Sequence, residues 1–111
     1  MVDYPFDRTG IERGADGIQR YRNLPTSVVA MLRSSVDRAP DAEAVVELDG
    51  QRLTYAQLWD RAARVAGGLR EQGVRAGDRV GIRMPNGADW AVAFFGTLMS
   101  GAVAVPVNIR L

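Results

Sequence analysis

The fold is decided by residues 53–111, LTYAQLWDRAARVAGGLREQGVRAGDRVGIRMPNGADWAVAFFGTLMSGAVAVPVNIRL. A helical pattern is followed there by a strand pattern, and the same order then repeats. A strand, a helix and a second strand at this spacing predict a parallel strand pair with a right-handed crossover. The sequence therefore predicts an α/β fold that stops after one βαβ unit, like the opening of a larger α/β enzyme.

The first helix of this stretch has a clear start. Thr54 is followed three residues later by Gln57, which is the spacing of a capping box. In that motif the hydroxyl accepts a hydrogen bond from a first-turn amide, and the glutamine side chain accepts one from the threonine amide. Gly73 predicts the end of the helix. One face carries apolar residues at intervals of three and four: Leu58, Ala62, Val65 and Leu69.

The βαβ unit follows this helix. We expect a strand at 79–84, a turn at 85–87, a helix at 88–100 and a second strand at 102–107. The helix is apolar nearly all round, which predicts burial on more than one side. The run 90–107 carries no charge and reaches the length of a membrane span. Glycines and a proline interrupt this run, so we interpret it as a buried helix and a buried strand.

The first half of the chain contains a leader, a helix and a small hairpin. Residues 1–24 mix arginines with acids such as Asp3, contain three glycines and show no apolar period, which predicts an irregular, solvated leader instead of a ligand-gripping arm. After Pro25, Thr26 or Ser27 can cap a helix that Pro40 closes. Residues 44–48 and 51–53 predict strands joined by a two-residue turn at Asp49 and Gly50. Residues 25–111 are therefore expected to form one incomplete subdomain with a partial layered fold.

The composition excludes most catalytic chemistry. The chain has no Cys and no His, and all fourteen basic residues are Arg. Disulfides, thiolate metal sites, histidine bases, Schiff bases and a P-loop lysine are therefore excluded. A net charge of +1 gives no electrostatic case for nucleic acid or an acidic membrane surface. The first residues lack the pattern of a signal peptide, so we expect a cytoplasmic protein.

The remaining candidate residues favour ordinary structural roles. Asp41 with Glu43, and Glu47 with Asp49, are carboxylate pairs that could form an oxygen-only metal site or an acid/base pair. Both pairs flank an exposed turn and strand, which favours solvated surface. Four aromatic residues at helical spacing favour core packing over a stacking platform: Trp59, Trp90, Phe94 and Phe95.

The turn MPNGAD, residues 84–89, is the one place in the βαβ unit where a phosphate could meet a helix start. It has a single glycine, and Asp89 in the first helical turn would repel an anion. We therefore expect an ordinary capped turn. No catalytic, cofactor-binding or metal-binding residue is predicted in this chain.

Three segments together resemble the adenylate-forming (AMP-binding) superfamily of acyl-CoA synthetases, peptide-synthetase adenylation domains and luciferases. They are LTYAQL at 53–58, GDRVGIRMPN at 77–86 and LMSGAVAVPVN at 98–108. The resemblance extends over 26–111, and VPVNIRL looks most like fatty-acyl and related carboxylate-CoA ligases. In the family the matching motifs are structural. Thr54 caps a helix, while Gly101 and Pro106 shape a helix-strand junction.

The resemblance implies a two-step reaction. A carboxylic acid, of the fatty-acyl kind, attacks the α-phosphate of ATP, and a thiol such as CoA then displaces AMP. ATP, Mg²⁺ and CoA are implied for the full-length family member, whose phosphate loop and catalytic lysine lie downstream of Leu111. The chain alone is therefore expected to be inactive. The alternative is a free-standing α/β binding module that self-associates through an exposed sheet edge.

Overall fold

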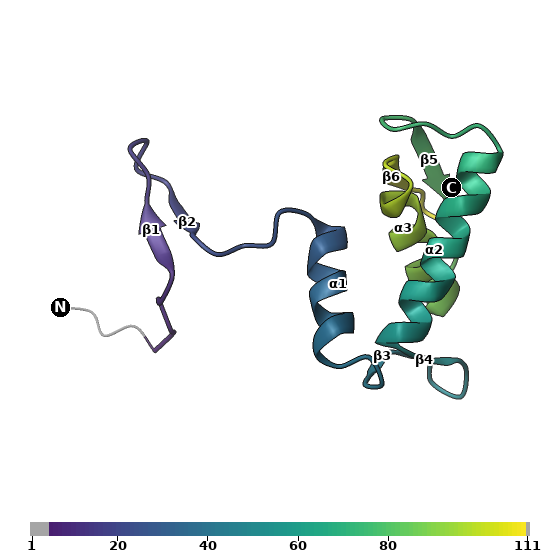
Figure 1. The fold of residues 1–111 in the computed structure, drawn as a ribbon, viewed down its shortest axis with the longest axis horizontal. Helices are drawn as coiled ribbons and strands as arrows, with labels where there is room; N and C mark the ends of the chain where they lie inside the picture. Colours follow the sequence, from purple (N-terminus) through teal and green to yellow (C-terminus); the bar gives the residue numbers. More distant parts are fainter. Residues whose placement is uncertain (1–4, 111) are drawn as a thin grey trace.

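The computed structural model describes residues 5–110, so Asp3 of the leader lies outside the described residues. The elements follow in the order β1 (Ile11–Arg13), β2 (Gln19–Tyr21), α1 (Val28–Arg38), β3 (Glu43–Val46), β4 (Arg52–Thr54), α2 (Tyr55–Glu71), β5 (Arg79–Ile82), α3 (Ala88–Met99) and β6 (Val103–Pro106). The strands form three two-stranded sheets (Figure 1). The pairs β1–β2 and β3–β4 are antiparallel, and β5–β6 is parallel. The predicted α/β class and the β5–α3–β6 unit are therefore confirmed.

The parallel pair runs from Arg79 opposite Val103 to Ile82 opposite Pro106. Both strands are shorter than predicted, although Val107 still donates its amide to the carbonyl of Ile82 at 2.8 Å. The uncharged run 90–107 divides into helix and strand as expected, but the prediction of a buried strand is wrong, because Val103 and Val105 of β6 are 50% and 38% exposed. Within residues 5–110, no helix has both the length and the apolar character needed to cross a membrane.

Helix α2 begins and ends as its sequence predicts. The Thr54 hydroxyl accepts from the Gln57 amide at 3.1 Å, and the Gln57 side chain accepts from the Thr54 amide at 2.9 Å. At the other end Gly73 has a φ of 94°, a conformation that glycine adopts without strain. Its amide and that of Val74 turn back to the carbonyls of Arg70 and Leu69. This is a Schellman ending, which satisfies carbonyls left unpaired by the last turn.

Helices α2 and α3 pack closely because Gly96 has no side chain. A Cβ atom at Gly96 would lie 2.6 Å from the Cβ and Cγ1 atoms of Val65 and 2.8 Å from the carbonyl oxygen of Ala62. Ordinary carbon contacts are about 3.5 to 4.0 Å. The face of α2 that carries Ala62 and Val65 is therefore the face that meets α3, as its apolar spacing predicted.

The core lies where α1, β4, α2 and α3 meet. Ser27, one of the two predicted caps, starts α1 by accepting from the Ala30 amide at 3.0 Å. Helix α1 buries one side chain of the core cluster, and the other elements supply the rest. The cluster consists of Leu32, Leu53, Leu58, Ala88 and Val92.

The β3–β4 turn differs from the predicted two-residue turn at Asp49 and Gly50. Glu47 and Gln51 close the loop, since the Glu47 amide donates to the Gln51 carbonyl at 2.9 Å. The loop therefore has three residues, and its first, Leu48, is 95% exposed. Asp49 takes a positive φ of 56°, which aspartate tolerates better than most residues. The added loop residue shifts the strand ends from those predicted.

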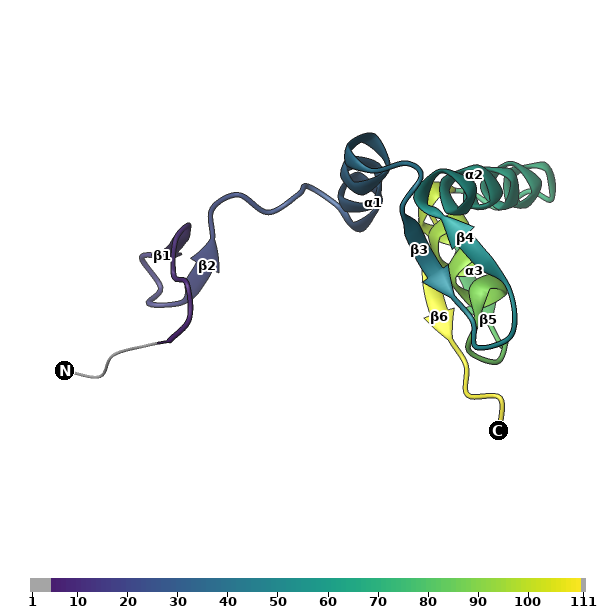
Figure 2. The same cartoon turned by 90° about the horizontal axis from the view of Figure 1, so that it is seen from below.

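The prediction of a wholly irregular leader is wrong, because residues 11–21 form the β1–β2 hairpin. The strands of this hairpin are almost wholly exposed, and local polar contacts support their backbone pairing. The Asp16 carboxylate accepts from the Ile18 amide at 3.1 Å and from both terminal nitrogens of Arg20 at 2.9 and 2.7 Å. Figures 1 and 2 both show the hairpin standing apart from the other elements on an extended segment.

Candidate functional site

A hollow lies just beyond the carboxyl ends of the parallel strands β5 and β6. We call it the strand-end hollow. In open α/β sheets, ligands bind in the crevice at this edge. Its volume is about 370 Å³. It is lined by Met84, Pro85, Asn86, Trp90, Pro106, Val107, Asn108 and Ile109.

The lining of the strand-end hollow is suited to binding and not to proton transfer. None of its side chains is ionisable, and its polar side-chain groups are the carboxamides of Asn86 and Asn108 and the indole N–H of Trp90. The Asn108 carboxamide oxygen already accepts from the Arg110 amide at 2.9 Å. The Ile109 carbonyl accepts from the Arg83 guanidinium at 3.3 Å. These contacts fix the segment that follows β6 without supplying an acid, a base or a nucleophile.

Next to this hollow, Glu47 reaches from the β3–β4 hairpin to the start of α3. Its Oε1 atom accepts from the Ala88 amide at 2.7 Å, and its Oε2 atom accepts from the Gln51 amide at 3.2 Å. Gly87 is the residue before α3 and has no side chain that could cap it. The predicted capped turn is therefore present, but its cap comes from a residue 41 positions earlier.

Two further side chains extend this link. The Gln51 side chain donates to the Asp89 carboxylate at 3.3 Å and accepts from the Arg61 guanidinium at 3.0 Å. Asp89 lies in the first turn of α3, where a negative charge is favourable. Glu47 and Asp89 thus place two carboxylates at this helix start, an arrangement that disfavours a phosphate there.

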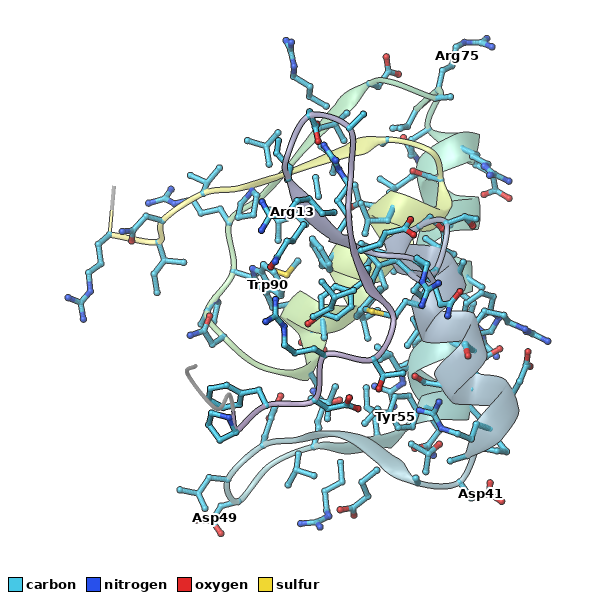
Figure 3. The ribbon with its side chains drawn as sticks, turned by 90° about the vertical axis from the view of Figure 1, so that its left-hand side faces the viewer. Arg13, Asp41, Asp49, Tyr55, Arg75 and Trp90 are labelled. Atoms are coloured by element: carbon cyan, nitrogen blue, oxygen red, sulfur yellow. The ribbon has the colours of Figure 1, made fainter. Side chains whose placement is uncertain are left out.

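The candidate carboxylate pairs do not converge. Glu43 pairs instead with Arg52, which donates to its two oxygens at 2.7 Å each. That hydrogen bonding from Arg52 holds the pKa of Glu43 below its usual value. Asp41 and Asp49 point outward at opposite ends of the hairpin (Figure 3). Among residues 5–110, no three acidic side chains gather to hold a metal ion.

The sequence interpretation missed the role of Glu47. The prediction of solvated surface is wrong for this carboxylate, because its side chain is part-buried at the helix start. The available signal was Gly87, because a glycine before a helix offers the first amides no side-chain cap and leaves them open to a partner from elsewhere.

The aromatic residues divide between the core and the strand-end hollow. Trp59 and Phe95 pack against the core cluster, as expected. Trp59 also lies under the Arg33 guanidinium, 5.0 Å from its ring centroid. Trp90 instead stacks on Phe94, with ring centroids 5.1 Å apart and planes 12° apart, and lines the hollow. The core prediction therefore describes Trp90 only in part.

Comparison with known proteins relates this chain to a family of enzymes. Residues 32–111 match the model of a family described as AMP-binding enzyme. Pyochelin synthetase PchE of Pseudomonas aeruginosa is 51% identical over 71 residues, which are 64% of this chain and 5% of that protein. A salicyl-AMP ligase / salicyl-S-ArCP synthetase of Mycobacterium tuberculosis is 38% identical over 105 residues, 95% of this chain and 18% of that protein.

The fold is also found in solved structures of such enzymes. A fatty acyl CoA synthetase from Mycobacterium tuberculosis superposes with a TM-score of 0.70 at 42% identity, covering 75% of this chain and 17% of that one. The chain thus spans less than a fifth of each of these relatives. The family match begins within α1 and continues through the βαβ unit to residue 111. The chain therefore belongs to the family of AMP-binding, adenylate-forming enzymes.

Proposed function

We propose that the chain is the N-terminal portion of an ATP-dependent, AMP-forming acyl-CoA synthetase. Such an enzyme joins a carboxylate to AMP with release of pyrophosphate, and CoA then displaces AMP to give a thioester. The observation that carries the proposal is the family match over residues 32–111. The similarity to a fatty acyl CoA synthetase at 42% identity supports a fatty-acyl substrate.

We also propose that the 111-residue chain is inactive by itself. It contains no Lys, His or Cys, and the strand-end hollow contains no ionisable side chain. The acidic residues between 5 and 110 do not cluster in a way that fits Mg²⁺. These residues therefore give structural support to a site built elsewhere in the enzyme.

A second candidate is a ligase for an aromatic acid. The match to the salicyl-AMP ligase covers 95% of this chain, so it includes the β1–β2 hairpin. The family model begins only at residue 32. A relative that shares the leader as well as the subdomain supports an aryl carboxylate substrate and a carrier-protein thiol in place of CoA.

Carboxylate-dependent exchange of radiolabelled pyrophosphate into ATP tests these proposals. The coding DNA would first be followed beyond codon 111 to a Ser/Thr/Gly-rich loop ending in Pro-Lys-Gly, and the whole frame expressed. Exchange with palmitate but not salicylate is expected for the first candidate, and the reverse for the second. The 111-residue chain should give no exchange above a blank without enzyme, and a clear signal from it would refute the claim of inactivity.

The alternative of a free-standing module has its own test. Light scattering coupled to size exclusion gives the mass of the isolated chain in solution. A monodisperse dimer that melts cooperatively would favour the module, because its sheet edges would then be paired. An aggregating chain would favour the enzyme portion, since open sheet edges and uncovered apolar surface promote association.

A further inference from the structure

We propose that Glu47 is a positioning residue that joins the β3–β4 hairpin to the 84–87 loop, and so fixes one wall of the strand-end hollow. It does this by accepting a hydrogen bond from the first amide of α3, so that its side chain caps the helix from a distant part of the chain. Helix α3 has no side-chain cap from its own N-terminal segment. The early amides of a helix lack partners within it, and Gly87 carries no side chain to serve them.

The Glu47 carboxylate fills the space beside two glycines, Gly87 and Gly50. Its Oε1 atom accepts from the Ala88 amide at 2.7 Å. A Cβ atom at Gly87 would lie 2.9 Å from that same oxygen, and a Cβ atom at Gly50 would overlap Oε2. Glycines therefore flank the side chain on both sides, and in each case the nearest atom to a new Cβ belongs to Glu47.

The contact between Glu47 and Ala88 holds the 84–87 loop beside the hairpin. Met84, Pro85 and Asn86 form part of the wall of the strand-end hollow. The same three residues, with Gly87, also line a second hollow of about 420 Å³ together with Glu47, Gln51 and Asp89. The loop thus lies between the hairpin and the hollow. Through Glu47, a shift of the hairpin moves the loop that shapes the hollow.

Hydrogen exchange of the protein expressed from its whole reading frame, followed by mass spectrometry of peptides, tests this role. Glu47→Ala should speed exchange in peptides covering 84–92 about five-fold, which is typical of a lost helix cap. Glu43→Ala is the matched control. It also removes a carboxylate from the β3–β4 hairpin, but the Glu43 carboxylate contacts Arg52 and not α3. The control should leave those peptides unchanged. Equal exchange in wild type and Glu47→Ala would overturn the proposal.

Glu47→Gln separates the effect of the hydrogen bond from the effect of the charge. This variant also tests the proposal if Glu47→Ala does not fold. Glutamine keeps one oxygen that can accept from Ala88, so exchange at 84–92 should stay within about two-fold of wild type. Rapid exchange confined to these peptides in Glu47→Gln would overturn the assigned hydrogen bond.

The glycine provides a second, independent check. Gly87→Ala should speed exchange at 84–92 more when it is made in the wild-type protein than when it is made in the Glu47→Ala variant. The new methyl group meets the Glu47 carboxylate oxygen in the first case, and the Glu47→Ala variant lacks that oxygen. Backbone strain at Gly87, whose φ is 158°, is common to both backgrounds and cancels in the comparison. Equal increments in the two backgrounds would show that the carboxylate does not occupy this space, which would refute the proposal.

Discussion

Replacing Gly96 with alanine tests how closely α2 and α3 approach each other. The new methyl carbon would lie 2.6 Å from two carbons of Val65 and 2.8 Å from the Ala62 carbonyl oxygen. Neither neighbour can turn aside, because Val65 Cβ is attached to the backbone and the Ala62 oxygen belongs to it. Relief therefore requires the two helices to separate by about 1 Å, given ordinary carbon contacts of about 3.5 Å or more.

The expected magnitude is the difference between two opposing effects. Alanine favours a helix over glycine by about 1 kcal/mol. Overpacking a core typically costs about 1 to 3 kcal/mol, and contacts this short belong near the upper end of that range. We therefore expect Gly96→Ala to lower the free energy of unfolding by about 1 to 2 kcal/mol. That corresponds to a fall in Tm of roughly 4 to 16 °C for a domain of this size.

The matched control is the same substitution at Gly68, in the interior of α2. A Cβ atom there meets nothing within 4 Å, so only the helix propensity changes, and Gly68→Ala should be stabilising by up to about 1 kcal/mol. Both variants can be followed by circular dichroism in urea, with the midpoint and the slope fitted together. If Gly96→Ala proved as stabilising as Gly68→Ala, the close approach of α2 and α3 would be refuted.

Three further substitutions test local features. Thr54→Ala removes the hydroxyl that caps α2 and should cost about 1 kcal/mol in urea unfolding; an unchanged midpoint would contradict the capping box. Because the hydrogen bond from Arg52 lowers the pKa of Glu43 from its usual 4.5, the pair stabilises the fold above that pH, and its contribution is lost as the pH falls through the lowered pKa. Acid titration should therefore destabilise wild type more than Glu43→Gln below about pH 4.5, and parallel acid curves would contradict this. Asp49→Gly should be neutral or stabilising, because Asp49 has a φ of 56°; a loss of more than about 0.5 kcal/mol would argue against that turn.

Local signals in the sequence were enough for most of the helices and for the βαβ unit. Thr54 with Gln57 and Gly73 mark the two ends of α2, because both motifs act between residues that are close in the chain. The parallel pairing of β5 and β6 followed from the order of elements and the length of the crossover. These features depend on backbone geometry that a few neighbouring residues determine.

Two kinds of feature could not be predicted from the sequence. Some depend on polar contacts that leave no apolar pattern in the sequence, and others depend on contacts between residues that are distant in the chain. The β1–β2 hairpin is held by Asp16 and its polar contacts, which leave no alternation to detect. The β3–β4 turn contains Leu48 because Glu47 and Gln51 close the loop, and Asp49 takes the positive φ within it. Glu47 reaches an amide 41 residues away. Its role becomes visible only once the hairpin and α3 lie side by side.

The parallel register of β5 and β6 also affects the order in which the chain can fold during synthesis. Each residue of β5 pairs with a residue 24 positions later, as Arg79 does with Val103. At translation rates of about 5 to 20 residues per second, roughly one to five seconds separate the emergence of the two partners from the ribosome. Over that interval α1, the β3–β4 hairpin and α2 have already been synthesised, while β5 has no β6 to pair with its hydrogen-bonding edge. The growing chain is therefore most open to chaperones, and to wrong strand pairing, in the seconds before β6 appears.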